Sequence, residues 1–284
     1  MFVTRFAPSP TGLLHRGHAF SVLTVWSAVR EAAEKADARF LLRIEDTDFT
    51  RCRPEYEAAI IEDLVWLGVD WELPLRRQSE HRADYDKALD RLRNMGVLYR
   101  CFRTRKELMA LAGMAPHSDD PDDPHAFSYG PMPPDEEAER LARGEAFAWR
   151  LSLDAARDRL GDLSELTWIE ERVLPGVHQA TPERLGDMVV GRKDIGAGYI
   201  IAAVVDDALQ GVTHVIRGED LIEVTSVQLV LQALLGLPTP VYRHHRLLIG
   251  PDGKRYAKRD KSVTLAELRA SGVTAESLKA ELGF

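Results

Sequence analysis

Two consecutive strand-and-helix pairs open this chain, and their order constrains its fold more than any other feature of the sequence. Residues 2–6 predict a short strand, and residues 17–34 repeat apolar side chains at helical spacing. Residues 39–44 predict a second strand, and a second helix follows Pro54, which suits a first helical turn, and ends near Gly68. Strands that alternate with helices in this order are typical of an α/β fold built on a parallel sheet.

Composition limits the classes of protein to which the chain can belong. Its 284 residues, 45% of them hydrophobic, suffice for one large domain or two smaller ones. The formal net charge is −8, so any contact with nucleic acid must come from a local basic patch. The only cysteines, Cys52 and Cys101, exclude a disulfide framework and favour a reducing compartment. We see no signal peptide and no membrane-spanning apolar run, so a soluble, cytoplasmic protein is expected.

An acidic segment interrupts the pattern in the middle of the chain. Residues 117–134 are rich in Asp and Pro, which predicts a solvated loop in preference to a metal site. The other predicted elements are strands at residues 146–153, 199–205 and 213–216, a helix at residues 224–235 that stops at Gly236 and Pro238, and a short helical segment at residues 265–282.

The loop between the first strand and the first helix carries the strongest functional signal. Residues 8–18 read Pro-Ser-Pro-Thr-Gly-Leu-Leu-His-Arg-Gly-His, and ligands of doubly wound sheets bind at this junction. The helix start offers N–H groups that suit phosphate, and Gly17 lets the backbone approach a ligand. His15 and His18 are three residues apart, so both imidazoles can donate to phosphoryl oxygens. The alternative is two surface histidines in an ordinary capped loop, which the preceding Pro-Ser-Pro-Thr-Gly disfavours.

Two further segments carry charges that suit ATP or an amino acid. Residues 254–262 form a basic loop that can close over a triphosphate, although alone it is better explained as a solvated surface. Residues 43–48 read Arg-Ile-Glu-Asp-Thr-Asp at a strand end, where acids can hold an amino group, a ribose or Mg²⁺. For Asp46 and Asp48, capping of a strand-to-helix turn is an equally good explanation.

An arginine stands at the end of the strand predicted at residues 213–216. There the planar fork of Arg217 can grip a carboxylate with two N–H groups. The alternative for Arg217 is a structural ion pair with Glu219 or Asp207. The sequence therefore leaves open whether this charge serves a ligand or the fold.

Together these segments resemble the catalytic half of class I aminoacyl-tRNA synthetases of the glutamyl type. Residues 15–18 correspond to the first family signature (His-Ile-Gly-His), and residues 256–259 to the second (Lys-Met-Ser-Lys-Ser). Sequence motifs of the glutamyl-type enzymes are found at residues 5–12, 43–48 and 215–220. The resemblance covers nearly the whole chain, and five blocks in the family's order make chance an unlikely explanation.

The resemblance implies a Rossmann-type parallel-sheet catalytic domain with an inserted connective subdomain and a short C-terminal helical remnant. Residues 1–100 and 190–249 are expected to form the catalytic domain, and residues 101–189 the connective insertion. Residues 250–284 are expected to hold the signature loop and a small helical remnant of the tRNA-stem contact region.

The resemblance also implies roles for individual residues. The residues implied to bind glutamate are Arg5, Ala7, Ser9, Glu45, Tyr199 and Arg217. Among them Glu45 would hold the α-ammonium group and Arg217 the γ-carboxylate. ATP, with Mg²⁺, would be bound by His15, Gly17, His18 and Lys258, and the catalytic groups would be His15, His18 and Lys258.

This chain departs from the family's pattern at several positions. Arg16 stands inside the first signature, Tyr256 and Ala257 inside the second, and Gly198 and Ile200 flank Tyr199. Many members carry a zinc site of three cysteines and a tyrosine in the insertion. Here Cys101 alone remains, so no bound zinc and no other metal site on the protein is expected.

One subfamily fits best, the glutamyl-queuosine tRNA(Asp) synthetases, which lack the anticodon-binding region. After Lys258 only 284 − 258 = 26 residues follow. The resemblance implies ATP-dependent, tRNA-independent activation of L-glutamate to glutamyl-adenylate. Transfer to queuosine in the anticodon loop of tRNA(Asp) would follow. The protein is expected to be a monomer. The basic residues available for that RNA are Arg16, Arg243, Arg246, Lys254, Arg255, Arg259 and Lys261.

Two other functions stay open at this level. One is a synthetase paralogue that glutamylates a protein or a small molecule, which the sequence does not exclude. The other is a non-catalytic binding module, against which the presence of His15, His18, Lys258 and Arg217 argues.

Overall fold

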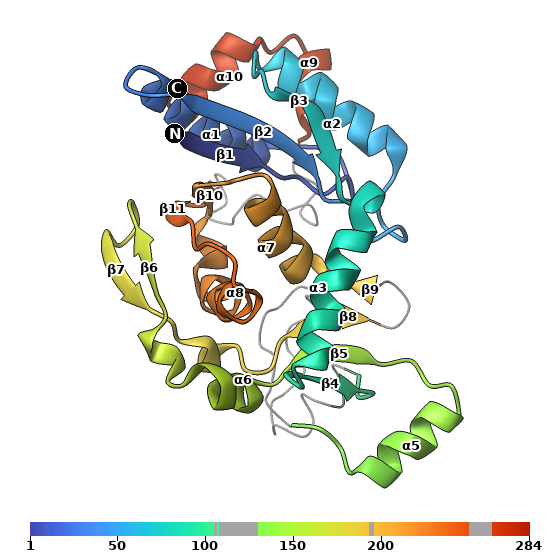
Figure 1. Cartoon of the computed structure of the whole chain (residues 1–284). Coiled ribbons are helices and arrows are strands. Elements are labelled where there is room, and N and C mark those ends of the chain that lie inside the picture. Colours follow the sequence, from blue (N-terminus) through green and yellow to red (C-terminus); the bar gives the residue numbers. More distant parts are fainter. Residues whose placement is uncertain (105–106, 108–129, 193–195, 250–262) are drawn as a thin grey trace.

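The computed structural model describes residues 1–104, 107, 130–192, 196–249 and 263–284, and these form layers of sheet and helix (Figure 1). The helices are α1 (Arg16–Ala33), α2 (Pro54–Trp66), α3 (Arg82–Asn94), α5 (Pro134–Ala142), α6 (Leu153–Leu160), α7 (Tyr199–Leu209), α8 (Ile222–Leu235), α9 (Leu265–Ala270) and α10 (Ala275–Leu282). The strands are β1 (Phe2–Phe6), β2 (Ala38–Ile44), β3 (Glu72–Arg77), β4 (Leu98–Cys101), β5 (Ala148–Leu151), β6 (Thr167–Glu170), β7 (Gly176–Gln179), β8 (Val189–Arg192), β9 (Gly196–Ala197), β10 (His214–Gly218) and β11 (Val241–His245). Within these ranges no helix is long and apolar enough to cross a membrane.

The N-terminal part folds as the sequence predicts. Strands β1, β2 and β3 form a parallel sheet, and α1 and α2 are the connections between them. Pro54 is the first residue of α2, and Gly68 follows the helix with φ 66°, a left-handed conformation that glycine adopts without strain. Apolar residues of both helices and the sheet share one core, to which α9 and α10 also contribute.

A second sheet continues the first across β1. Its order is β10-β11-β6-β7, with β10 and β11 parallel. The Thr213 N–H donates to the Val3 carbonyl at 2.9 Å, so β10 begins beside the start of β1. The chain runs from β1 outward to β2 and β3, and later adds β10 and β11 on the other side of β1. This change of direction is a topological switch point, where doubly wound folds bind ligands at the strands' carboxyl ends.

A third, antiparallel sheet has the order β4-β5-β8-β9. In Figure 1 it lies apart from the β1-β2-β3 sheet, beside the lower part of α3. Its strands come from both sides of the domain boundaries predicted at residues 100 and 190. The β6–β7 hairpin lies within the predicted insertion but pairs with β11 through Glu170 and Tyr242. The strand predicted at residues 146–153 is confirmed as β5, and most of the predicted acidic loop, residues 117–129, is outside the described residues.

The strand predicted at residues 199–205 is wrong, because this segment is the start of helix α7. Every residue from Ile200 to Asp207 is buried, so the segment lacks the exposed polar face by which a surface helix is recognised in a sequence. In Figure 1 α7 lies beside α8 in the middle of the molecule, between the parallel sheet and α3. The strand predicted at residues 213–216 and the helix at residues 224–235 are confirmed as β10 and α8. The predicted C-terminal helical segment is two helices, interrupted near Gly272.

Candidate active site

Four of the predicted glutamate-binding residues converge near the switch point. Arg5 lies on β1, Glu45 follows β2, Tyr199 begins α7 and Arg217 lies on β10. Their charges act on one another: desolvation and the Glu45 carboxylate raise the pKa of the Tyr199 phenol to about 12, while Arg217 and Arg5 oppose that shift. Tyr199 is 39% exposed, so part of its side chain faces solvent beside these charges.

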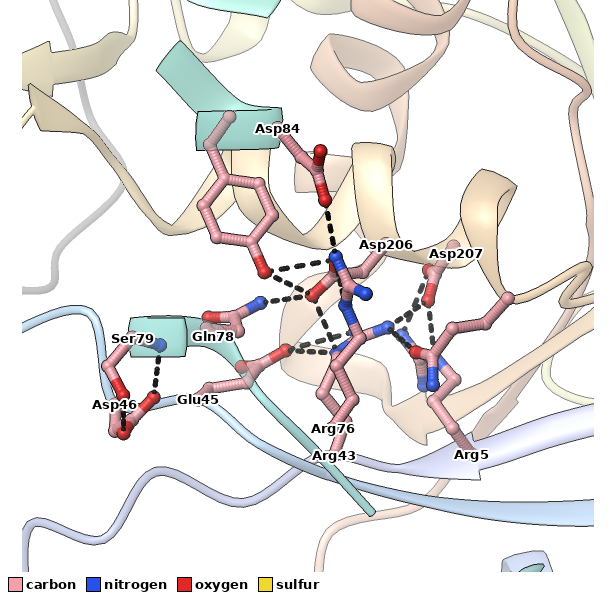
Figure 2. A network of polar contacts seen from close by, with 12 residues as sticks. Arg5, Arg43, Glu45, Asp46, Arg76, Gln78, Ser79, Asp84, Asp206 and Asp207 are labelled. Atoms are coloured by element: carbon pink, nitrogen blue, oxygen red, sulfur yellow. Dashed lines mark hydrogen bonds and ion pairs between the residues drawn. The ribbon is translucent and has the colours of Figure 1, made fainter. Parts of the chain in front are cut away.

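Arg5 is neutralised inside the protein. Its Nε donates to Asp207 Oδ1 at 2.8 Å and its Nη2 to Asp207 Oδ2 at 3.3 Å, and both side chains are buried (Figure 2). The pair ties the end of β1 to α7. Any ligand carboxylate that reaches Arg5 therefore has to share this cation with Asp207.

Arg43 is the fully buried centre of the charge network in Figure 2. Its Nη1 donates to Asp207 at 2.7 Å, and its Nη2 donates to Glu45 at 3.0 Å. Burial disfavours the charged guanidinium, but Asp207, Glu45 and Asp206 outweigh that effect and raise the pKa of Arg43 above its ordinary value. Sequence reasoning included Arg43 in a family block but gave it no role.

Asp206 ties β3, α3 and the short segment between them to α7. Its carboxylate accepts hydrogen bonds from Arg76 Nε at 2.7 Å, from Gln78 Nε2 at 3.0 Å and from the Tyr85 hydroxyl at 2.9 Å. Arg76 also donates to Asp84 at 3.0 Å, so β3 and α3 are both anchored to α7 (Figure 2). A fully buried carboxylate needs such a set of donors.

The three acids after β2 have different roles. Burial raises the pKa of the Glu45 carboxyl, against the opposing effects of Arg43 and Arg5, so an additional cation would be favoured there. Asp46 accepts from the Ser79 N–H at 2.8 Å. Asp48 accepts from the Thr50 N–H at 3.1 Å. Asp48 thus stabilises a local turn, as the capping alternative predicts, whereas Asp46 ties the end of β2 to Ser79, 33 residues further along the chain. Glu45 alone of the three faces the charge network.

Arg217 is held by neutral groups. Its Nε donates to His244 Nε2 at 3.1 Å and its Nη1 to Gln228 Oε1 at 2.8 Å. Its Nη2 donates to Thr225 Oγ1 at 2.7 Å and to the Leu221 carbonyl at 3.2 Å. These four contacts leave one of the five guanidinium N–H groups for another acceptor.

The ion pair considered as the alternative role of Arg217 does not form. Asp207 accepts from Arg5 and Arg43, and Glu219 accepts from the Leu247 N–H. Across the described residues no carboxylate forms an ion pair with Arg217, although its side chain is only 6% exposed. Burial accordingly lowers the pKa of Arg217 below its ordinary value, and a ligand carboxylate would relieve that cost.

His244, next to Arg217, is neutral. Its Nδ1 donates to Glu170 Oε2 at 2.7 Å, and its Nε2 accepts from Arg217. The adjacent His245 contacts Ser21 on α1 at 3.0 Å. The two histidines thus have partners on different elements, as expected for neighbours on a strand, and they do not form a metal pair.

Stability should fall as the pH drops below the ordinary histidine pKa. Burial and the Arg217 charge lower the pKa of His244 from 6.5 to about 4, so between these values the unfolded chain binds the additional proton. Melting temperatures at pH 7 and pH 5 measure the effect. The drop should be smaller in His244→Gln, which has no titrating ring. An equal drop in both proteins would contradict the lowered pKa.

His15 and His18 form the N-terminal cap of α1. The His15 Nδ1 accepts from the Gly17 N–H at 3.1 Å, and the His18 Nδ1 accepts from the His15 N–H at 3.2 Å. An imidazole nitrogen that accepts carries no proton, so in both neutral rings the proton is on Nε2, a donor suited to phosphoryl oxygen. The ring centroids are 3.9 Å apart, which brings the two histidines together as predicted.

Two other predicted residues precede this cap in the chain. Ala7 and Ser9 lie in the loop after β1, which the Glu45 N–H joins to the end of β2 through the Pro8 carbonyl at 3.0 Å. Lys258, with the rest of the second signature and all of the basic loop at residues 254–262, lies outside the described residues. Of the departures beside Tyr199, Ile200 packs into the core.

Zinc is still expected to be absent. Cys101 is a buried free thiol at the end of β4. Outside the undescribed segments, no three His, Cys, Asp or Glu side chains are grouped so as to hold a metal ion. A structural zinc site needs four ligands, and the insertion contains a single cysteine. Elemental analysis of the purified protein tests this, and one zinc per chain would refute it.

Comparisons with known proteins agree with this geometry. The family model described as "tRNA synthetases class I (E and Q), catalytic domain" matches residues 1–282. A Rhodobacter capsulatus protein named glutamyl-Q tRNA(Asp) synthetase is 42% identical, across 99% of this chain and 100% of its own length. A Symbiobacterium thermophilum protein of the same name is 40% identical, across 100% of this chain and 86% of its own.

A solved structure supports the same assignment. The glutamate-tRNA synthetase of Elizabethkingia anophelis superposes with a TM-score of 0.78 at 25% identity, covering 100% of this chain. This chain spans 61% of that protein's length. The expected α/β class and the resemblance to the catalytic half of a glutamyl-type synthetase are therefore confirmed. The chain is a ligase that belongs to the class I tRNA synthetase family for glutamate and glutamine.

Proposed function

We propose that this enzyme activates L-glutamate with ATP, without requiring tRNA, and transfers the glutamyl group to queuosine in the anticodon loop of tRNA(Asp). One observation carries the choice of amino acid: Arg217 is a buried cation without a carboxylate partner among the described residues. The other two arginines of the site differ in this respect, because Arg5 and Arg43 both pair with Asp207.

Glutamate complements this distribution of charge. In the proposed complex its γ-carboxylate lies against Arg217, and its α-ammonium group lies near Glu45, whose desolvated carboxylate gains from a cation. Arg217 has one uncommitted N–H group. To bind a carboxylate through two N–H groups, it must give up one of its present hydrogen bonds to a neutral acceptor. Glutamine would present an amide NH₂ to the cation and leave its charge unmatched.

Activation then needs no nucleophile from the protein. The α-carboxylate of glutamate attacks the α-phosphorus of ATP, a new oxygen–phosphorus bond forms, and pyrophosphate leaves with the electrons of the broken bond. His15 and His18 donate Nε2–H groups to phosphoryl oxygens. Lys258 supplies positive charge that balances the negative charge growing on the pyrophosphate leaving group. Gly17 allows the backbone to approach the nucleotide. Mg²⁺ bound to the ATP phosphates would screen the same charge.

Independence from tRNA is supported by how the pocket is held. Arg217 is oriented by Gln228, Thr225 and His244, all of which lie within the chain. No RNA contact is needed to build this arrangement, so glutamate can bind first. The two free cysteines are consistent with a reducing compartment, and we place the reaction in the cytoplasm, performed by a monomer.

Queuosine as the acceptor is supported by the relatives. The Rhodobacter capsulatus protein, which this chain matches along its whole length, is named for glutamyl transfer to Q in tRNA(Asp). Anticodon loops present unstacked bases that a protein pocket can take up. Two of the basic residues considered for RNA contact are engaged in ion pairs: Arg16 with Glu281 at 2.8 Å, and Arg243 with Glu171 at 2.6 Å. The RNA must therefore compete with these acids or use other cations.

The acceptor can be tested by labelling RNA with radioactive glutamate. Full labelling is expected of tRNA(Asp) that contains queuosine, with none on the unmodified transcript. Removal of the 3′-terminal adenosine should leave labelling unchanged, because that adenosine is not the acceptor. ATP–pyrophosphate exchange without tRNA measures activation separately. Equal labelling of unmodified tRNA, loss of labelling after removal of the 3′-terminal adenosine, or labelling confined to proteins would overturn the acceptor assignment.

A further inference from the structure

Glu170 and His244 form a buried pair behind the guanidinium of Arg217. His244 lies on β11 and Glu170 at the end of β6, the two strands that pair at Tyr242. The His244 side chain is fully buried and that of Glu170 nearly so. His244 Nδ1 is 2.7 Å from Glu170 Oε2, and its Nε2 is 3.1 Å from Arg217 Nε.

Glu170 is fixed independently of the imidazole. Its Oε1 accepts from the backbone N–H groups of His244 at 3.0 Å, Arg172 at 2.9 Å and Val173 at 3.2 Å. That leaves Oε2 to face His244 Nδ1. An ionised carboxylate has no proton to give, so Nδ1 must carry the proton and Nε2 must present its lone pair to Arg217.

Aromatic rings hold the imidazole on its other sides. Trp168 packs edge-on against it, with centroids 5.7 Å apart, and the Tyr242 ring is parallel to it at 6.0 Å. The same Tyr242 ring lies 5.2 Å from the Arg217 guanidinium carbon. The ring of His244 therefore has little freedom to rotate, and a carboxylate in its place would neutralise Arg217 as Asp207 neutralises Arg5.

We propose that His244, with its tautomer set by Glu170, is the positioning residue that aims Arg217 at the substrate carboxylate while leaving the arginine its charge. The pair contacts no substrate and acts only through Arg217. This inference rests on the proposed function, in which Arg217 binds the glutamate carboxylate. According to this inference, His244 contributes to the affinity for glutamate although it does not line the pocket.

Two amide substitutions at His244 separate its two contacts. The oxygen of a glutamine can occupy the place of Nε2 and accept from Arg217, whereas an asparagine reaches only the place of Nδ1 and keeps the contact with Glu170. In ATP–pyrophosphate exchange, His244→Asn should raise the KM for glutamate about tenfold or more, because a hydrogen bond to a charged group is lost. His244→Gln should stay within about threefold of the wild type. The KM for ATP should not change in either variant.

Glu170→Gln tests the tautomer with His244 in place. The three backbone N–H groups require the amide oxygen at the Oε1 position, so the amide NH₂ faces Nδ1 and moves the imidazole proton to Nε2. Two donors then oppose each other at Arg217, and the KM for glutamate should rise about tenfold or more while the KM for ATP stays constant. Nitrogen-15 NMR of the imidazole should report the proton on Nδ1 in the wild type and on Nε2 in the variant.

The outcomes distinguish this inference from the proposed function. Arg217→Ala measured in parallel should raise the KM for glutamate more than any variant of the pair. If it does not, the proposed role of Arg217 fails. If it does, but Glu170→Gln switches the tautomer without changing the KM, the positioning role is overturned. Equal KM values for His244→Asn and His244→Gln would overturn it as well.

Discussion

Lys258→Ala is expected to slow glutamate-dependent ATP–pyrophosphate exchange by about a hundredfold or more. Donors placed where charge develops in a transition state typically contribute that much to the rate. The KM for glutamate should change little, because Lys258 is assigned to ATP. Lys35→Ala is a matched control, since Lys35 is exposed just after α1. Exchange near the wild-type rate in Lys258→Ala would show that the basic loop has no role in activation.

The histidines of the same assembly need a more careful substitution. His15 caps α1 through its Nδ1, and an alanine there would cost about 1 kcal/mol of stability in addition to any catalytic loss. Asparagine preserves the cap and removes the imidazole Nε2–H group. His15→Asn should therefore lower the exchange rate strongly with little change in melting temperature. If the exchange rate and the melting temperature fell together, the role of His15 would be purely structural.

Arg217→Gln is expected to reduce kcat/KM for glutamate by on the order of a hundredfold, because the variant removes the charge that matches the γ-carboxylate. The wild type should prefer glutamate to glutamine by roughly 1–3 kcal/mol or more, the cost of leaving a buried donor unpaired. The variant should lose most of that preference. Exchange assays with both amino acids measure the ratio.

A surface arginine provides the control for this prediction. Arg39 pairs with Glu72 at 2.6 Å on the exposed side of the sheet, so Arg39→Gln should leave both activities near wild type. Equal exchange of glutamate and glutamine by the wild-type enzyme would contradict the assignment of Arg217. A similar loss in Arg39→Gln would point to general destabilisation.

Local signals made the N-terminal half of the fold predictable from sequence. Pro54 sets the start of α2, and the apolar spacing of residues 17–34 gives α1 within a residue of its observed bounds. Segment 199–205 could not be assigned in this way, because a helix buried on all sides carries the same apolar, β-branched run as a buried strand. The β6–β7 hairpin offered little signal either, since each of its strands has only four residues and β7 is largely exposed.

In the candidate site, the types of functional residue could be predicted from sequence, but their partners could not. Arginines, acids and histidines at strand ends could be picked out because such ends meet at a switch point. Their pairings could not, because Arg5 bonds to Asp207 and His244 to Glu170 through tertiary packing alone. The adjacent His244 and His245 can be interpreted from sequence as a metal pair, or better as structural residues or substrate-side contacts, and no motif marks Glu170. Arg43 belongs to a recognisable motif, but that it is completely buried could be learned only from its packing against α7.

The charge network also has a consequence for how the protein is made. Arg5 and Asp207 are 202 residues apart in the chain, and Arg43 and Asp207 are 164 apart. During synthesis both arginines leave the ribosome long before their shared carboxylate. The first sheet therefore cannot close over them until α7 has been made, because an unmatched buried cation is too costly. Contacts of such long range also slow folding. Catalytic competence should accordingly appear late, together with the docking of α7.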